Sequence, residues 1–536
     1  MSEHRRARRV AAGVLVALVL TLVTGCAPSG APGANPTIPR TASGRPNLQG
    51  IWQARNAAAA DLLDHAARHE MRAGRSVVEG DEIPYQPWAA ARKLENAASR
   101  ATADPLAKCY MPGVPRIMYM PYPFHLFQTD DHVGITFEWS QVFRLIYTNG
   151  SKPHDGIEFW MGDSRGRWEG DTLVVDVTNH NDKTWFDMAG NFHSEALHLV
   201  ERFTMTDANT IQYELTVEDP KVFTRPWKMT MPLHRETDSD RVLEYQCNAE
   251  AEEARGDFER DPRTWYPGPA GTAAQPAAVA GEDVPSAPAP ARTAAQPKGP
   301  IRRLADGKPD LSGHYQPDGG GANYGLETHP PDFLTPGGRG VIVDPADGQL
   351  PMLPWAETEQ KNRMLPERGY DDPTAHCFVA GVPRSMYTPS PLHILQPPGY
   401  VVVLHERMAW RVIPLDGRPH LPDTIRLWQG DSVGRWEGDT LVIETRNLNG
   451  KTWLNEVGEI VSHAETVVER LTPLDADTLH YEATVTDPLV YSRPWTIALP
   501  MNRQADDLLE VACHEDNQDL QHLKDVRDEV RRRTRR

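Results

Sequence analysis

The stretch WMGDSRGRWEGDTLVVD, residues 160–176, recurs almost unchanged as WQGDSVGRWEGDTLVIE at residues 428–444. Matched positions are 268 residues apart throughout, as Trp160 and Trp428 are. In both copies Glu-Gly-Asp lies between an Arg-Trp pair and an apolar Leu-Val pair, which is the pattern of a tight turn joining two β-strands. Glycine supplies the positive φ that such a turn requires. The chain is therefore a duplication, and the motif predicts one hairpin in each repeat.

The polar residues of this motif have both a structural and a functional interpretation. Arg167 is placed to pair with Glu169 or Asp176 on a neighbouring strand, which would support the hairpin alone. In the functional interpretation, Asp163, Arg167 and Glu169 line the mouth of a pocket. We favour the structural interpretation, because the turn and its two strands account for every position.

After the first cysteine of each repeat, short segments rich in Val, Leu, Phe, Thr and Trp follow one another with turns between them. This spacing predicts an antiparallel meander. We therefore expect a mainly β fold of two tandem antiparallel β-barrels of lipocalin or calycin kind, or two β-sandwiches, each with short N-terminal helices. In the first repeat the expected strands are a short one near Trp52 and segments 124–128, 133–139, 142–148, 165–169, 172–178, 196–205, 210–218, 226–233 and 241–247.

Helices are expected at a few places. Pro87 and Pro354 each stand where a helix begins. Residues 54–74 are Ala-rich and predict a helix, whereas residues 316–340 are Gly/Pro-rich and predict a loop. A further short helix is expected after residue 517.

The amino-acid composition divides the chain into two expected domains joined by a linker. Its 536 residues are too many for one hydrophobic core, and the segment between the repeats is a Pro/Ala/Gly linker with few apolar side chains to bury. The expected order is a signal peptide at 1–25, a flexible tether at 26–40, a first β-domain at 41–262, the linker at 263–300, a second β-domain at 301–520 and a basic tail at 521–536.

The N-terminus predicts export. Four arginines between residues 5 and 9 precede an apolar run at 10–23, and Val-Thr-Gly-Cys26 follows. This resembles the lipobox of bacterial lipoproteins, which implies cleavage before Cys26, lipid attachment to it and anchoring in the cell envelope. An ordinary signal peptide or an uncleaved anchor is the alternative, although the apolar run is short for a membrane span. The formal net charge of −18 argues against a nucleic-acid partner.

Four further cysteines recur at matching places in the two repeats. An exported protein meets an oxidising compartment, where an even cysteine count favours disulfides. Four cysteines allow three pairings, and the duplication favours one bridge in each repeat, Cys109–Cys247 and Cys377–Cys513. Zinc binding is the alternative, but no CxxC spacing supports it. We expect no metal and no cofactor.

Polar side chains also recur in or beside the expected strands. If they face a barrel interior, their charges must be paired or bound to a ligand. We take them as candidate ligand-binding residues, with an internal Glu–Arg pair that only fixes the fold as the alternative. The candidates are His125, Glu138, Arg144 and Lys183 in the first repeat and His393, Glu406 and Arg411 in the second.

Three polar residues, Asp182, His193 and Glu195, are found only in the first repeat, because glycine, valine and histidine replace them in the second. On a strand, residues 193 and 195 would share a face. That arrangement suits a catalytic acid/base pair better than a metal site. Simple polar packing is the alternative. On this view the second repeat is the degenerate one.

The two repeats resemble a poorly characterised family of exported bacterial proteins and lipoproteins. The shared features are Cys-x-x-x-Gly-Val-Pro-Arg, the duplicated WxGDSxGRWEGDTLV motif and a final cysteine, over residues 41–250 and 304–517. The resemblance implies membership of that family and supplies no catalytic residues and no substrate.

Three functions fit these observations. We expect a lipid-anchored envelope protein whose two β-domains bind a small hydrophobic or sugar-like ligand. The first alternative is an acid/base enzyme, a hydrolase, lyase or isomerase, with its site in the first repeat. The second is a structural envelope protein without a ligand.

Overall fold

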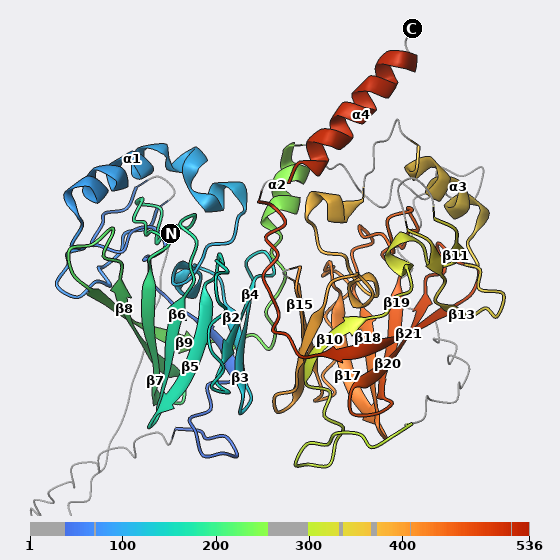
Figure 1. Cartoon of the computed structure of the whole chain (residues 1–536), viewed down its shortest axis with the longest axis horizontal. Coiled ribbons are helices and arrows are strands. Elements are labelled where there is room, and N and C mark those ends of the chain that lie inside the picture. The colour runs from blue at the N-terminus through green and yellow to red at the C-terminus, as the bar shows by residue number, and fades with distance from the viewer. Residues whose placement is uncertain are drawn as a thin grey trace, which may run out of the picture. The chain divides into compact units, whose positions relative to one another are not determined.

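The structure is a computed structural model that describes residues 38–68, 71–255, 298–331, 336–365, 372–407, 409–515 and 517–534. The expected signal peptide, the lipidation residue Cys26 and nearly all of the expected linker lie outside the described residues. Residues 38–536 form one compact unit. Within it, each repeat folds into its own barrel of β-strands (Figure 1).

The first barrel is closed, with strands β1 to β9 paired in sequence order and β9 paired back to β1. This confirms the expected mainly β, barrel-like fold. Most strands lie within two residues of the expected segments. The strands are β1 Gly50–Gln53, β2 Phe124–Gln128, β3 His132–Phe137, β4 Phe143–Tyr147, β5 Asp163–Glu169, β6 Thr172–Thr178, β7 His198–Asp207, β8 Thr210–Glu218 and β9 Trp227–Arg235.

The alternation of side chains explains why these segments form a barrel. Every second residue of β7 is buried, so Leu199, Glu201 and Phe203 face inward while Val200 and Arg202 face outward. Strand β8 shows the same pattern, with Tyr213 fully buried. Burial of one face of each strand fixes the register of the sheet, because a slip of one residue would expose that face.

The duplicated motif forms the predicted hairpins. In the first repeat β5 and β6 pair in register up to Glu169 and Thr172, and Gly170 in the turn has a φ of +60°. Arg167 bonds to both Glu169 and Asp176, as expected. The equivalent turn glycine in the second repeat, Gly438, has a φ of +62°. The structural interpretation of this part of the motif is confirmed.

The meander prediction is wrong at one place. Strands β4 and β5 run parallel, with Ile146 opposite Ser164. Antiparallel neighbours need only a short turn, but residues 148–162 carry the chain back along the barrel before β5 begins. The barrel therefore closes with one parallel pair among antiparallel ones.

The second barrel has the same strand order. Its sheet runs from β16 through β15, β14, β10, β21, β20, β19 and β18 to β17, and within the described residues it is open between β16 and β17. Short strand β13 pairs with β21, and β11 pairs with β12 apart from the barrel. The strands are β10 Gly313–Pro317, β11 Thr328–His329, β12 Gly338–Arg339, β13 Ile342–Asp344, β14 Leu392–Leu395, β15 Tyr400–His405, β16 Ala409–Pro414, β17 Asp431–Glu437, β18 Thr440–Arg446, β19 Thr466–Pro473, β20 Thr478–Thr486 and β21 Trp495–Gln504.

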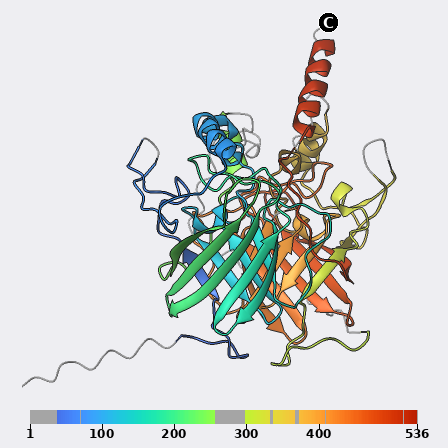
Figure 2. The same cartoon turned by 60° about the vertical axis from the view of Figure 1, so that its left-hand side comes forward.

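The helices agree with the sequence only in part. α1 (Pro87–Ala103) and α3 (Pro354–Arg363) begin at the predicted prolines, and α4 (Asp519–Thr534) follows residue 517 as expected. Figure 2 shows α1 lying at one end of the first barrel. α2 (Cys247–Arg255) was not predicted. None of the described helices is long and apolar enough to cross a membrane.

The Ala-rich residues 54–74 are not the predicted helix. The described part of this segment forms turns and isolated bridges. Ala58 and Leu62 are fully buried in the barrel core, and the Leu62 N–H donates to the carboxylate of Asp187 at 2.9 Å. Tertiary packing therefore overrides the helical propensity of alanine here.

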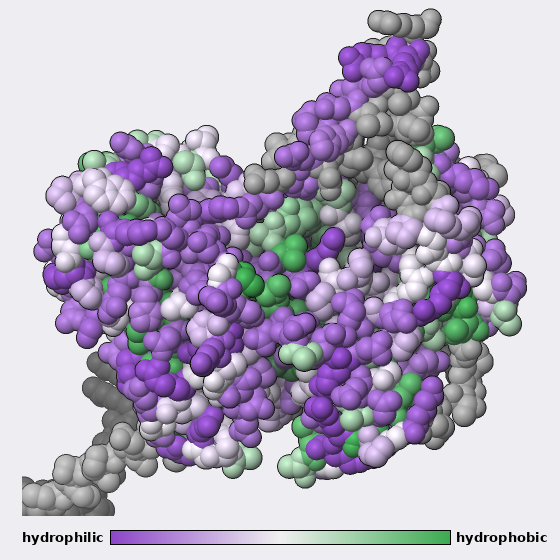
Figure 3. Space-filling model, in the orientation of Figure 1, coloured by the Kyte–Doolittle hydropathy of each residue, from purple (hydrophilic) through white to green (hydrophobic). Residues whose placement is uncertain are grey.

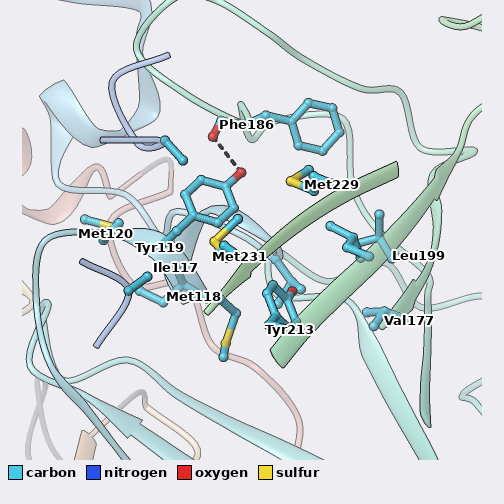
Figure 4. Packing of buried hydrophobic residues seen from close by; sticks show 14 of the residues in the cluster. Ile117, Met118, Tyr119, Met120, Val177, Phe186, Leu199, Tyr213, Met229 and Met231 are labelled. Atoms are coloured by element: carbon cyan, nitrogen blue, oxygen red, sulfur yellow. Dashed lines mark hydrogen bonds between the residues drawn. The ribbon is translucent and has the colours of Figure 1, made fainter. Parts of the chain in front are cut away.

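A short segment fills the interior of each barrel. In the first repeat the 3-10 helix η2 (Arg116–Tyr119) is buried with the strands, and the Tyr119 hydroxyl donates to the Phe186 carbonyl at 2.9 Å. Figure 4 shows Tyr119 beside Met229, Met231 and Tyr213. In the second repeat η7 (Arg384–Met386) is buried in the same way, and the Tyr387 hydroxyl donates to the Leu454 carbonyl at 2.7 Å.

Two disulfides connect the residues that the duplication predicts. Cys109 bonds to Cys247 and Cys377 bonds to Cys513, so each repeat contains one bridge. The bridges close loops of well over a hundred residues, which restricts the unfolded chain strongly.

Candidate functional site

Buried ion pairs account for two of the predicted ligand-binding residues. Arg144 on β4 pairs with Glu201 on β7, which also accepts a hydrogen bond of 2.6 Å from the Tyr213 hydroxyl. The Arg144 Nε donates to Ser164 of the duplicated motif at 3.0 Å. All of these groups are buried. The Arg144 guanidinium is thus satisfied by protein partners, as a buried charge must be.

The second barrel repeats this arrangement. Arg411 pairs with Glu469 at 2.6 Å, the Tyr481 hydroxyl donates to Glu469 at 2.8 Å, and Ser432 accepts from Arg411 at 3.1 Å. The alternative of an internal Glu–Arg pair describes both arginines. Their partners are Glu201 and Glu469, not the neighbouring Glu138 and Glu406.

The three candidate catalytic residues are not assembled into a site. His193 lies before β7, so the premise that it shares a strand face with Glu195 is wrong. Its Nε2 lies 2.6 Å from the Thr184 hydroxyl, and its ring is 2% exposed. Burial lowers the pKa of His193 below its ordinary value, although the Ser194 carbonyl opposes the shift. Glu195 and Asp182 are exposed, and Glu195 forms an ion pair with Lys221.

The other predicted ligand residues lie between the two repeats. The His125 ring packs on Phe127 and makes an edge contact with Tyr400 of the second repeat, with ring centroids 5.3 Å apart. The His393 ring contacts His132 of the first repeat at 5.2 Å. Burial lowers the pKa of both His125 and His393 to about 3, so both rings are neutral.

Lys183 lies at the same boundary, whereas Glu138 and Glu406 contact Leu243 and Leu509 of their own repeats. Lys183 forms an ion pair with Glu515 of the second repeat. Glu138 and Glu406 are partly buried, which raises their pKa values. His125, His393 and Lys183 therefore mark an interface between the repeats.

The segment after the last strand of each barrel crosses to the other repeat. We name residues 241–247 the first arm and residues 507–513 the second arm. The prediction that 241–247 is a barrel strand is wrong: β9 ends at Arg235, and the first arm runs in extended form beside Glu138 and Trp139. Both arms end at a disulfide cysteine. Each disulfide therefore bonds the end of an arm to the repeat to which that arm belongs.

Each arm binds the beginning of the duplicated motif of the other repeat. In the second arm, Glu510 accepts hydrogen bonds from the backbone N–H groups of Trp160 and Met161 at 2.7 and 3.0 Å. In the first arm, Glu244 accepts from the backbone N–H groups of Trp428 and Gln429 at 2.6 and 3.0 Å. The first residues of the motif are thus a docking site for a carboxylate.

The charges beside these contacts differ between the two repeats. In the first motif Asp163 pairs with its own neighbour Arg165, which also lies 3.5 Å from Asp507 of the second arm. In the second motif valine replaces that arginine, and Asp431 pairs instead with Arg241 of the first arm at 2.9 Å. If the first arm docked on the motif of its own repeat, Arg241 would lie beside Arg165, and the two positive charges would repel each other. The charge pattern therefore favours exchange of the arms over docking of each arm on its own repeat.

A cleft between the repeats lies beside the second arm. Tyr110 and Trp160 of the first repeat and Phe378 and Val379 of the second line it. Three of the disulfide cysteines line it, and Arg407 and Glu515 supply charge. Figure 3 shows hydrophobic residues gathered near the middle of this face, where the second arm passes in Figure 1.

The two arm glutamates were not among the predicted site residues. Both belong to a Leu-Glu-x-x-Cys pattern that recurs at matching positions, Leu243 to Cys247 and Leu509 to Cys513. The recurrence of that glutamate was the available signal. Among the described residues, no group of three or more His, Cys, Asp or Glu side chains is arranged to hold a metal ion.

Comparisons with known proteins give little further information. No protein-family model and no curated protein matches the chain. Among solved structures it is similar to a protein of unknown function from the DUF3598 family of Nostoc punctiforme PCC 73102, at 7% sequence identity over 72% of this chain and 88% of that chain, with a TM-score of 0.14.

Proposed function

We propose that this protein is an exported, lipid-anchored binding protein that holds a small, partly apolar molecule in the cleft between its two repeats. The observation that carries the proposal is the cleft itself. Its aromatic and aliphatic walls with a few polar groups are typical of small-molecule sites.

The location of the cleft differs from that in a lipocalin, where the ligand lies inside the barrel. Here η2 and η7 occupy the barrel interiors, and the buried arginines have protein partners. The duplication places two walls opposite each other, and the disulfides fix the arms that border the opening. A cleft held in this way is preorganised, which lowers the entropic cost of binding.

The cellular location rests on the N-terminal sequence. Cys26 follows an apolar run, as in a lipoprotein signal, and the two disulfides suit an oxidising compartment outside the cytoplasm. We also propose that the chain belongs to the exported family whose motifs it resembles. A lipid anchor would place the cleft in the cell envelope, close to exported or imported small molecules.

A neutral hydrophobic probe tests the binding proposal. We expect N-phenyl-1-naphthylamine to bind the wild-type protein with enhanced fluorescence. Ala512, on the second arm, lines the cleft, so Ala512→Phe should fill it and weaken binding at least tenfold. Ala91→Phe, at an exposed position of α1, is the matched control and should bind as the wild type does. Equal binding by the two variants, or none by the wild type, would contradict the proposal.

A further inference from the structure

The two repeats differ where the interior 3-10 helix enters the barrel. In the first repeat this region is filled by large apolar side chains that are 2–3% exposed, namely Ile117, Met120, Phe137 and Val142. The equivalent residues of the second repeat are smaller or polar. They are Ser385, Thr388, His405 and Ala409.

A cavity occupies this place in the second repeat. All four substituted residues line it. Phe378, Val379 and the Cys377–Cys513 disulfide complete an apolar wall.

Two polar groups face this cavity without a partner. The Ser385 Oγ and the His405 Nε2 are buried and make no hydrogen bond to the described residues, and the two residues are 5% and 4% exposed. An unsatisfied buried polar group costs about 1–3 kcal/mol. A hydroxyl or carbonyl group on a bound molecule would satisfy both. In the first repeat, Ile117 and Phe137 carry no polar atoms that need such a partner.

The charges of the lining residues indicate the charge of the ligand. Arg384 is neutralised by Asp372, to which it donates two hydrogen bonds of 2.8 and 2.7 Å. Arg407 is exposed and donates to the Ser390 hydroxyl at 3.2 Å, and its charge also acts on the carboxylates of Glu406 and Glu456, neither of which lines the cavity. None of the described residues that line the cavity is Asp or Glu. Arg407 is therefore an accessible cation at the edge of an apolar cavity.

We propose that this cavity of the second repeat binds a small carboxylic acid with an apolar body and a distal hydroxyl or carbonyl group. The carboxylate pairs with Arg407, the body packs against Phe378 and Val379, and the distal group reaches Ser385 and His405. The proposal deepens the proposed function and rests on it, because Phe378, Val379 and Arg407 line both the cavity and the cleft. On this basis the second repeat is the one specialised for binding.

A matched series of probes tests each part of this assignment by calorimetry on the full chain. 4-Hydroxyphenylacetate carries both groups, phenylacetate lacks the hydroxyl, and tyramine replaces the carboxylate with an ammonium. We expect 4-hydroxyphenylacetate to bind about tenfold more tightly than phenylacetate and tyramine not to bind. Arg407→Gln should weaken 4-hydroxyphenylacetate about tenfold. Binding of tyramine as tightly as 4-hydroxyphenylacetate would overturn the proposal.

A second measurement, on a variant of the cavity lining, locates the site. Ser385→Ile/His405→Phe installs the residues of the first repeat, so it should fill the cavity, abolish 4-hydroxyphenylacetate binding and leave N-phenyl-1-naphthylamine binding in the cleft within twofold of wild type. If this variant does not fold, Ala409→Val replaces it. Unchanged 4-hydroxyphenylacetate binding would overturn the assignment. If only the neutral probe binds the wild type, this inference fails and the proposed function stands; if neither probe binds, both fail.

Discussion

The carboxylate of Glu510 accepts a hydrogen bond of 2.7 Å from the backbone N–H of Trp160, a residue 350 positions earlier in the chain. Glu244 makes the equivalent contact to Trp428 at 2.6 Å. The most strongly repeated sequence of the protein is thus explained by two roles. Its end forms a hairpin turn, and its beginning receives an arm from the other repeat.

Removal of an arm carboxylate should destabilise the protein. Glu510→Ala leaves the N–H groups of Trp160 and Met161 without their acceptor, which we expect to lower the free energy of unfolding by about 1–3 kcal/mol. Glu214→Ala, at an exposed position of β8, is the control and should change it by less than about 0.5 kcal/mol. Chemical denaturation measures both. Equal effects would show that the contact contributes nothing specific.

The same carboxyls should make stability depend on pH. Burial raises the pKa of Glu244 and Glu510 to about 7 in the folded protein, above the ordinary value of 4.5, although the backbone N–H groups oppose the shift. The unfolded chain therefore releases these protons first, and their contribution to stability is lost as the pH rises from 4.5 through 7. Glu244→Gln/Glu510→Gln should lose less stability than wild type between pH 5 and 8. An identical loss in both proteins would refute the assignment.

The buried Arg144–Glu201 pair should be essential to the first barrel. Glu201→Ala leaves the Arg144 charge buried without its partner, and we expect a loss of about 3–5 kcal/mol in the free energy of unfolding. Arg202→Ala, the next residue on β7, breaks only the exposed pair with Glu169 and should cost less than about 1 kcal/mol. Similar losses in the two variants would contradict the assigned role of the buried pair.

The lipid anchor is testable in cells. We expect Cys26→Ser to abolish incorporation of labelled palmitate and to release the protein from washed membranes, because the thioether-linked lipid would be lost. Wild-type protein should remain with the membranes. A Cys26→Ser protein that is still labelled and still sediments would rule out the lipoprotein assignment.

Local patterns predicted the parts of the fold that depend on neighbouring residues. The alternation along β7 and β8 and the glycine at position 170 identified strands and a turn correctly, because burial and turn geometry act within a few residues. The Ala-rich segment 54–74 failed, because Leu62 depends on Asp187, 125 residues away. Propensity carries no information about such a partner.

The site was harder to predict for the same physical reason. Residues 241–247 have the composition of a barrel strand, and only the packed structure shows that they lie outside the barrel, bonded both to Glu138 of their own repeat and to Trp428 of the other. The cavity of the second repeat depends on differences between equivalent residues. His405, for example, stands where the first repeat has Phe137, and this difference is informative only when the two barrels are compared. Asp182, His193 and Glu195 also differ between the repeats, but they do not line this cavity.

Cleavage of the linker tests the exchange of arms most directly. A protease site inserted near Gln275 would separate two halves that share no disulfide, since 109–247 and 377–513 each lie within one half. Size-exclusion chromatography after cleavage should show the halves eluting together in the wild type and apart in Glu244→Ala/Glu510→Ala. Wild-type halves that separate freely, or variant halves that remain together as tightly as wild type, would contradict the account.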